Sequence, residues 1–242
     1  MGIPLLKLEL KLALQVWCGR GCKLKVQLYI KRFLDVLISL VILVFVFPFM
    51  VLIAFLIKVT SKGPILYTQE RLGENCRCFI IYKFRTMVEN AEFVRDGLAV
   101  KSNDARITML GRILRKTSID EMPQLFNVII GDLSLVGPRP ALPAQLKYYN
   151  SHQRRRFEVR PGLTGLATVR GRCSIPWSRR IELDIEYIDK FSLLLDFKIL
   201  FKTVYVVLFG KDTYYDSTDG PAFDLADPND LPQAEQSRKK GD

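Results

Sequence analysis

The longest apolar run in the chain extends from Val36 to Ile57, where only Ser39 is polar. A helix of 22 residues is about 33 Å long, which is enough to cross the hydrocarbon core of a bilayer. Pro48 lies inside this run, and a proline within a helix removes one backbone hydrogen bond and bends the axis. The pattern predicts a membrane helix over residues 31–58 that is kinked at Pro48.

The charges beside this helix are basic at both of its ends. Before it stand Arg20, Lys23, Lys25, Lys31 and Arg32, and after it Lys58, Lys62, Arg71 and Arg77. Positive residues next to membrane segments stay in the cytoplasm, so an ordinary single span would show a bias toward one end. The symmetry favours a re-entrant helix that enters the membrane, bends and returns to the cytoplasmic face. A straight span with a tolerated kink is the alternative.

The two ends of the chain differ in composition from the rest. Residues 1–30 alternate apolar and basic positions, as expected for an interfacial amphipathic extension and not for a cleavable signal. Residues 211–242 form an acidic tail with eight acids and four bases. The whole chain has a net charge of +11, so the first 210 residues carry 32 bases against 17 acids. Such a surface attracts anions such as lipid headgroups, nucleotide phosphates or nucleic acid.

Residues 59–210 show the mixed pattern of a small α+β domain that is predominantly helical. A strand is expected between the turns at Gly63 and Gly73, and a second strand over 79–87. The period of two places Lys83 and Arg85 on one face of the second strand, where they would hold phosphate oxygens or simply face solvent. Further helices are expected over residues 89–100, 106–116, 143–156 and 182–209, and a short strand over 167–172.

Several local features of this domain are also expected. Asp104 is the predicted N-cap of the helix over 106–116. The glycines of 160–165 are expected to let the backbone approach a ligand closely. The basic triplet 154–156 is interpreted as a surface or headgroup-contacting feature, and the apolar half of 182–209 as core or membrane interface.

Cysteine and histidine offer no recognisable metal site. The chain has five cysteines, an odd number, and one histidine, His152, at no zinc-binding spacing. Free thiols in a reducing cytosol are expected, and His152 is interpreted as a surface residue.

The candidate chemistry centres on Asp120 and Glu121, adjacent carboxylates between a basic and an apolar segment. Pro123 lacks an N–H and therefore fits only among the first residues of the helix that follows. If Ser118 were the N-cap, with Glu121 closing a capping box, Pro123 would delete a helical hydrogen bond. We therefore favour Asp120 as the N-cap of a helix that ends at Gly131.

An N-cap position would favour the ionised form of Asp120, because free N–H groups and the positive end of the helix dipole face it. An ionised carboxylate can cap a helix, bind a metal ion or act as a nucleophile. The residue pattern by itself leaves all three roles open.

Five motifs, in this order along the chain, resemble the bacterial sugar transferase family, the monotopic polyprenol-phosphate phosphoglycosyl transferases. They are Lys31-Arg32-Phe33-Leu34-Asp35, Tyr82-Lys83-Phe84-Arg85-Thr86-Met87, Ser118-Ile119-Asp120-Glu121-Met122-Pro123-Gln124, Ser134-Leu135-Val136-Gly137-Pro138-Arg139-Pro140 and Arg160-Pro161-Gly162-Leu163-Thr164-Gly165. The resemblance covers roughly residues 29–209.

This resemblance implies a re-entrant helix and transfer of a sugar 1-phosphate from a nucleotide sugar, with UDP as the expected nucleotide, to polyprenyl (undecaprenyl) phosphate. Asp120 matches the nucleophile of the family and Glu121 its Mg²⁺ ligand. Basic positions that would hold phosphates are Lys83, Arg85, Arg115, Arg139, Arg160 and Arg172. The implied setting is the cytoplasmic face of the bacterial inner membrane, where the lipid product would pass to downstream glycosyltransferases for surface glycan assembly.

Two other classes of protein fit the charge and the apolar run. One is a non-enzymatic peripheral protein that binds anionic lipid or nucleic acid, and the other is a structural anchor for an assembly complex. Neither would need the Asp120–Glu121 pair. Nucleic acid is not an expected partner, because the chain lacks both the interleaving of aromatic and basic residues and a recognition-helix pattern.

Overall fold

The computed structural model describes residues 3–88, 104–171 and 175–209, with the side chains of the first helix described from Leu24 onward. The elements in chain order are α1 (Ile3–Thr60), β1 (Leu66–Leu72), η1 (Glu74–Cys76), β2 (Cys78–Phe84), α2 (Met109–Lys116), η3 (Ile119–Glu121), α3 (Gln124–Ile130), β3 (Ser134–Val136), η4 (Pro143–Tyr148), α4 (Ser151–Arg154), η5 (Arg155–Phe157), β4 (Gly162–Thr164), α5 (Leu166–Arg170), α6 (Trp177–Asp189) and α7 (Leu193–Phe209). This mixed, mainly helical fold is the class that the sequence predicts.

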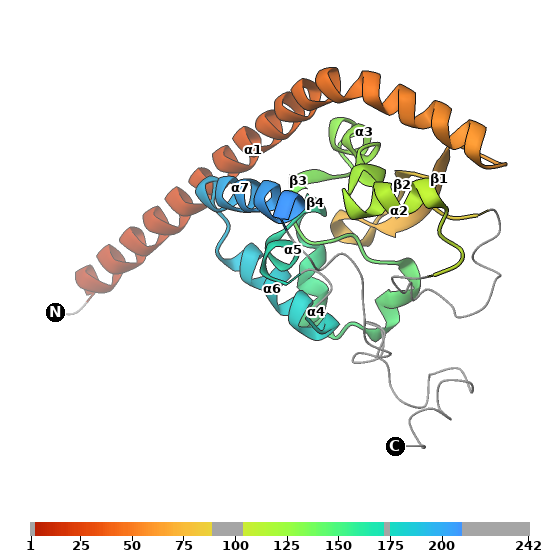
Figure 1. Ribbon diagram of the computed structural model, residues 1–242. Helices are drawn as coiled ribbons and strands as arrows, with labels where there is room; N and C mark the ends of the chain where they lie inside the picture. The colour runs from red at the N-terminus through yellow and green to blue at the C-terminus, as the bar shows by residue number, and fades with distance from the viewer. Residues whose placement is uncertain (1–2, 89–103, 172–174, 210–242) are drawn as a thin grey trace, which may run out of the picture.

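The helix α1 lies across the rest of the molecule, and its N-terminal part projects beyond it (Figure 1). Its ribbon bends within the orange segment, and Pro48 is the proline inside this helix. Because proline cannot donate the backbone hydrogen bond of its turn, a bend in this part of α1 is expected. The helix runs unbroken through residue 30, where the sequence suggests a change from interfacial to membrane character.

Much of the apolar surface of α1 is uncovered. The part from Leu24 to Thr60 is long and apolar enough to cross a membrane, as judged from length and composition, and only 11% of its most apolar stretch is buried. Val44 and Phe45 are 71% and 72% exposed. The core helix of a soluble protein would be mostly buried. The exposed apolar surface of α1 therefore suggests contact with a membrane.

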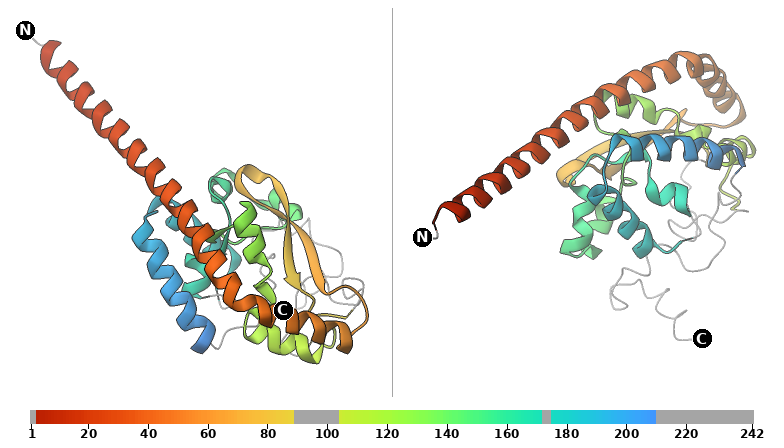
Figure 2. Two further views of the ribbon diagram at one scale, coloured as in Figure 1. Left: turned by 90° about the horizontal axis from the view of Figure 1, so that it is seen from above. Right: turned by 90° about the vertical axis from the view of Figure 1, so that its left-hand side faces the viewer.

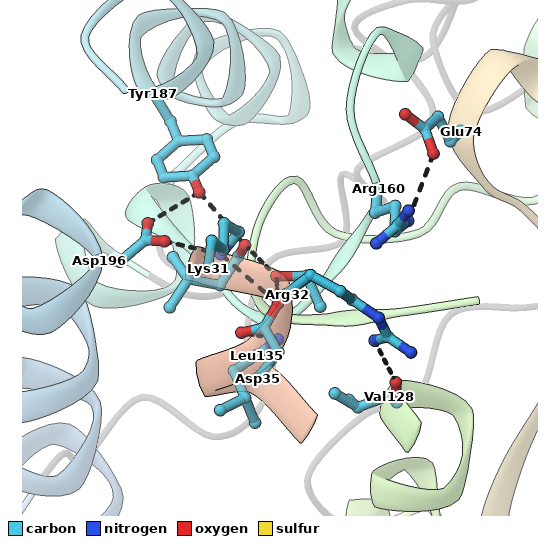
Figure 3. A network of polar contacts seen from close by, with 11 residues as sticks. Lys31, Arg32, Asp35, Glu74, Val128, Leu135, Arg160, Tyr187 and Asp196 are labelled. Carbon is cyan, nitrogen blue, oxygen red and sulfur yellow. Dashed lines mark hydrogen bonds and ion pairs between the residues drawn. The ribbon is translucent and has the colours of Figure 1, made fainter. Parts of the chain in front are cut away.

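One turn of α1 is attached to the domain by a buried polar network (Figure 3). The Nζ atom of Lys31 donates to Asp196 Oδ2 of α7 over 2.7 Å, and the Tyr187 hydroxyl donates to the other oxygen of that carboxylate. Asp35 accepts hydrogen bonds from the Ser134 hydroxyl, 2.8 Å away, and from the Leu135 N–H. The motif over 31–35 therefore joins α1 to both α7 and β3.

Arg32 contacts the end of α3 in the same turn of α1. Its guanidinium donates to the carbonyl oxygen of Val128 at 2.6 Å (Figure 3). It also donates to the carbonyl oxygen of Ile129 at 2.9 Å. These carbonyls lie in the last turn of α3, where the helix offers them no N–H partner, and a cation is favoured at that end of the dipole. Gly131 ends α3 with φ of 114°, as the sequence predicts.

Two small sheets frame the domain. Strands β1 and β2 form an antiparallel hairpin in which Tyr67 pairs with Lys83, and β3 pairs in parallel with β4, with Ser134 opposite Gly162. A Cβ at Gly162 would lie 2.1 Å from the backbone nitrogen of Gly137. The sequence predicts that the glycines of 160–165 let the backbone approach a ligand. At Gly162 the group that lies this close is the backbone of Gly137.

The apolar clusters pack the domain against α1. The main cluster contains Val128, Leu133 and Leu135, and Ile38 and Ile42 of α1 cover it. From above, α7 lies alongside α1 (Figure 2). The apolar second half of the region 182–209 forms this helix, in which Ile199 is buried and Phe201 is 76% exposed. It therefore contributes to the core and also presents an apolar surface.

Several local predictions are wrong. Thr108, not Asp104, caps α2 by accepting a hydrogen bond from the Gly111 N–H, while Asp104 binds the Arg106 guanidinium. Residues 166–170 are a helix and not a strand, because Gly165 is extended and starts a new turn after β4. The predicted helix over 143–156 is divided into η4, α4 and the start of η5. The predicted helix over 89–100 lies outside the described residues.

Candidate active site

The carboxylates of Asp120 and Glu121 project from a short 3₁₀ turn, η3, between α2 and α3. Ser118 precedes them in the left-handed region with φ of 57°, which ends the path of α2. Pro123 stands immediately before α3, so its missing N–H costs the helix nothing. The predicted N-cap role of Asp120 is therefore wrong, although the constraint set by Pro123 is met.

Apolar side chains on both sides of the carboxylates hold this turn in place. Ile119 and Met122 pack against a buried cluster of Met50, Ile57, Phe84 and Leu114. Two members of that cluster belong to the second half of α1, beyond Pro48. The turn that carries the acidic pair is thus seated directly against the predicted membrane helix.

Glu121 is bound by two cations from separate segments. Its Oε1 atom lies 2.6 Å from Lys83 Nζ of β2 and 3.1 Å from Arg139 Nη2, in the loop after β3. Burial alone would raise the pKa of Glu121, but Lys83 and Arg139 together hold that pKa well below its usual range. The carboxylate is therefore ionised throughout the neutral pH range.

Asp120 is in a different electrostatic position from its neighbour. Burial first, and then the charge of Glu121, raise the pKa of Asp120 to about 6, against the lowering effect of Lys83, Arg115 and Arg139. At pH 7 most of this carboxylate is still ionised. The cations that lower the pKa of Asp120 therefore come from three separate segments. The sequence instead predicts that the start of a helix favours its ionised form.

The other predicted cations occupy separate environments. Arg115 Nε donates to the Thr86 hydroxyl over 2.8 Å, and its charge lowers the pKa of Asp120. Arg85 is buried beyond the end of β2 and donates to the carbonyl and hydroxyl oxygens of Ser61 at the end of α1. Lys83 and Arg85 therefore reach different partners, although the period of two places them on one face.

Arg160 and Arg172 are not placed beside the acidic pair by any described contact. Arg160 faces Glu74 at 3.4 Å (Figure 3), and its charge also acts on Arg32. Arg172 lies outside the described residues. Their assignment to substrate phosphates stays a prediction.

Two further arginines near the site are missed by the sequence analysis. Arg71 of β1 lies close enough to Arg139 and Glu121 to feel both charges, and burial followed by Arg139 lowers its pKa to about 10. The period of two could have indicated this position, because it places Arg71 on the same face of β1 as Tyr67, the residue that pairs with Lys83. Arg156, interpreted from sequence as part of a surface triplet, is buried beside Asp184. His152 is exposed as predicted.

The carboxylate oxygens of the acidic pair suit a hard divalent cation that also binds oxygen atoms of a substrate. Mg²⁺ is commonly bound by one or two carboxylates together with substrate phosphates and water. Adjacent carboxylates on one short turn supply such oxygen ligands. In the described part of the chain no group of three or more His, Cys, Asp or Glu side chains is placed to hold a metal ion without a substrate. Cys76 and Cys78, the cysteines whose side chains the structure describes, are free.

Comparison with known proteins decides the family of this chain. The model of the family described as bacterial sugar transferase matches residues 26–210, which include every described element from β1 to α7. The chain belongs to the bacterial sugar transferase family. It is therefore an enzyme of the phosphoglycosyl transferase type, as its motifs predict.

Curated proteins match over most of the chain. The exopolysaccharide production protein ExoY of Sinorhizobium fredii is 38% identical over 198 residues, which cover 76% of this chain and 88% of that protein. The uncharacterized sugar transferase EpsL of Bacillus subtilis is 45% identical over 63% of this chain and 74% of its own length. The undecaprenyl-phosphate galactose phosphotransferase of Salmonella typhimurium is 40% identical over 74% of this chain, a match that spans 40% of that longer protein.

Proposed function

We propose that this protein transfers a sugar 1-phosphate from a UDP-sugar to undecaprenyl phosphate, forming the polyprenyl diphosphate sugar and UMP. The observation that carries this proposal is the acidic pair on η3, with Lys83 and Arg139 on Glu121, seated against α1. Several relatives bear names that state this chemistry, among them the undecaprenyl-phosphate glucose-1-phosphate transferase of Klebsiella pneumoniae, 37% identical over 78% of this chain.

In the first step an oxygen of ionised Asp120 attacks the β-phosphorus of the nucleotide sugar. A bond forms between that oxygen and phosphorus, the bond from phosphorus to the bridging oxygen breaks, and UMP departs with the bond electrons. In the second step an oxygen of the lipid phosphate attacks the same phosphorus. The Asp120–phosphorus bond breaks, and the carboxylate is regenerated.

The cations around the pair make the attack of one anion on another feasible. Lys83, Arg115 and Arg139 lower the pKa of Asp120 and would face the charge that builds up on the phosphoryl oxygens. Glu121, with substrate phosphate oxygens, would hold Mg²⁺, which would neutralise the diphosphate of the donor. Lys83 and Arg139 keep Glu121 ionised for that role.

Residence at the membrane follows from α1. We infer that the helix enters the inner membrane and returns to the cytoplasmic face, because basic residues flank both ends and the helix bends in the segment that contains Pro48. The site would then lie at the height of the lipid phosphate. The product would serve the glycosyltransferases that extend a surface glycan.

The decisive experiment separates a covalent intermediate from direct transfer. Purified protein with Mg²⁺ and a panel of UDP-sugars, without lipid, should release at most about one equivalent of UMP with the correct donor and gain the mass of a sugar phosphate on Asp120. Addition of undecaprenyl phosphate should discharge the adduct. Asp120→Asn should fold and form no adduct, whereas the matched surface change Asp189→Asn should behave as the wild type.

Two results would contradict the mechanism. A direct transferase would release no UMP before the lipid is added. Appreciable turnover by Asp120→Asn would exclude this carboxylate as the nucleophile.

A further inference from the structure

The loop that carries Arg139 is held by donors from outside the loop. Four consecutive carbonyl oxygens, from Pro138 to Ala141, each accept a hydrogen bond from another segment. Their donors are the Gly162 N–H at 2.8 Å, Arg156 Nη2 at 2.8 Å, Arg71 Nη1 at 3.2 Å and the Leu72 N–H at 2.9 Å. Every carbonyl of this stretch is therefore fixed by a different part of the fold.

The sequence of the loop explains why outside donors are needed. Pro138 and Pro140 have no N–H and keep φ near −65°, so the loop between them cannot form its own ladder of hydrogen bonds. Its conformation depends on acceptor sites that other segments fill. Arg139 itself, the residue whose side chain reaches Glu121 at 3.1 Å, is held at its carbonyl by Arg156.

Arg156 is fixed more tightly than a surface arginine. It is 2% exposed, and its guanidinium donates to the Tyr149 hydroxyl at 2.9 Å and to Asp184 Oδ2 at 2.7 Å, in addition to the Arg139 carbonyl. The rings of Tyr149, Phe157 and Trp177 lie within 5.8 Å of its Cζ atom. A buried arginine whose two terminal nitrogens are both hydrogen-bonded stays in one orientation and can hold another group rigidly.

We propose that Arg156 is a positioning residue for the transfer reaction, acting through Arg139 by holding the Arg139 carbonyl while Asp184 and Tyr149 fix its guanidinium. A role in stability alone would require only the Asp184 pair and the aromatic rings. The contact with the Arg139 carbonyl adds a path of two hydrogen bonds from the buried cluster to Glu121. This inference rests on the proposed function, in which Arg139 acts on the acidic pair.

The first test follows the loop itself and does not depend on turnover. The variant Arg156→Met/Asp184→Leu removes the buried pair together, because a lone buried charge would be strongly destabilising. The matched control Arg155→Met/Asp189→Leu removes the neighbouring exposed pair. Hydrogen exchange should rise at least about tenfold in the first variant at the Gly162 and Leu72 amides, which donate to the carbonyls of Pro138 and Ala141 in the loop. It should stay unchanged there in the control.

The second test is a double-mutant cycle on kcat/KM. A small misplacement of a binding group can cost about 100-fold, so we expect Arg156→Met/Asp184→Leu and Arg139→Gln each to lower kcat/KM by roughly 10- to 100-fold. If Arg156 acts through Arg139, combining them should lower it no further than Arg139→Gln alone. Losses that multiply, or exchange that rises equally in the control, would overturn the proposal.

A folding failure of the variant and a failure of the proposed function can both be distinguished from a failure of the Arg156 proposal. If the pair variant does not fold, Arg156→Lys carries the same expectations, since it keeps a cation beside Asp184 without the planar fork. If the wild type releases no UMP with any donor, the proposed function has failed. The exchange measurement then still decides whether Arg156 holds the Arg139 loop.

Discussion

Lys83 Nζ lies 2.6 Å from Glu121 Oε1, so a cation near the end of β2 meets a carboxylate 38 positions later in the chain. This pair keeps Glu121 ionised while Asp120, the next residue back, has its pKa raised to about 6. Two adjacent carboxylates thus have separate titration ranges. Such a separation is typical of sites in which two acids have different tasks.

The rate of adduct formation should depend on the ionisation of Asp120. Because the folded pKa is about 6, the rate should fall as the pH drops through that value. Lys83→Met removes a charge that lowers this pKa and should move the midpoint to higher pH by roughly half a unit to one unit. Adduct formed in single-turnover mixtures at about pH 5 to 8 measures the midpoint.

The control for this prediction is an exposed lysine that does not contact the acidic pair. Lys190 pairs with Glu186 on the surface of α6, and Lys190→Met should leave the midpoint unchanged. An unchanged midpoint in Lys83→Met would show that Lys83 does not act on the nucleophile.

Turnover should require Mg²⁺ through Glu121. Glu121→Gln retains the size of the side chain but loses the charge that a hard cation prefers, so the Mg²⁺ concentration for half-maximal activity should rise at least about tenfold. This concentration is measured by following UMP release as a function of the Mg²⁺ concentration. Glu182→Gln, an exposed change beside His152, is the matched control. Full activity of the wild type in EDTA would remove the metal from the mechanism.

The ends of the apolar segment should lie on one side of the membrane. Cysteines introduced as Leu28→Cys and Lys62→Cys in a chain without other accessible thiols should both react from the cytoplasmic side with a reagent that cannot cross the membrane. Pro48→Ala should restore the missing backbone bond and favour a straight span, which moves one label to the other side. Labels on opposite sides of the unaltered helix would contradict the re-entrant model.

Loss of Lys31 should loosen the attachment of α1 to the domain. Lys31→Met leaves the Asp196 carboxylate without its cation, at a position that is only 6% exposed. Removing one partner of a buried pair costs about 3–5 kcal/mol, so the free energy of unfolding should fall by that order. The double variant Lys31→Met/Asp196→Leu should recover part of the lost free energy of unfolding, because it leaves no unpaired buried carboxylate. Denaturant unfolding in lipid nanodiscs measures both, and the exposed change Lys58→Met should have little effect.

The class of the enzyme is evident from the sequence, which also predicts the acidic pair Asp120–Glu121. Pro48 inside an apolar run, Pro123 before a helix and Gly131 after it act through local backbone geometry, so their effects can be read without knowledge of the fold. Short motifs such as those around Asp120 and Arg139 are also local, and the family that they predict is confirmed by the comparison.

What surrounds the pair is decided only by the tertiary structure. Lys83, Arg115 and Arg139 act on Asp120 because the hairpin, α2 and the loop after β3 pack together under α1, and no local pattern specifies those distances. For the same reason Arg156 reads as part of a surface triplet but is buried against Asp184, and Asp120 reads as a helix cap but belongs to a separate turn. Backbone preferences act within a few residues, whereas burial and charge pairing depend on segments that meet only when the chain folds.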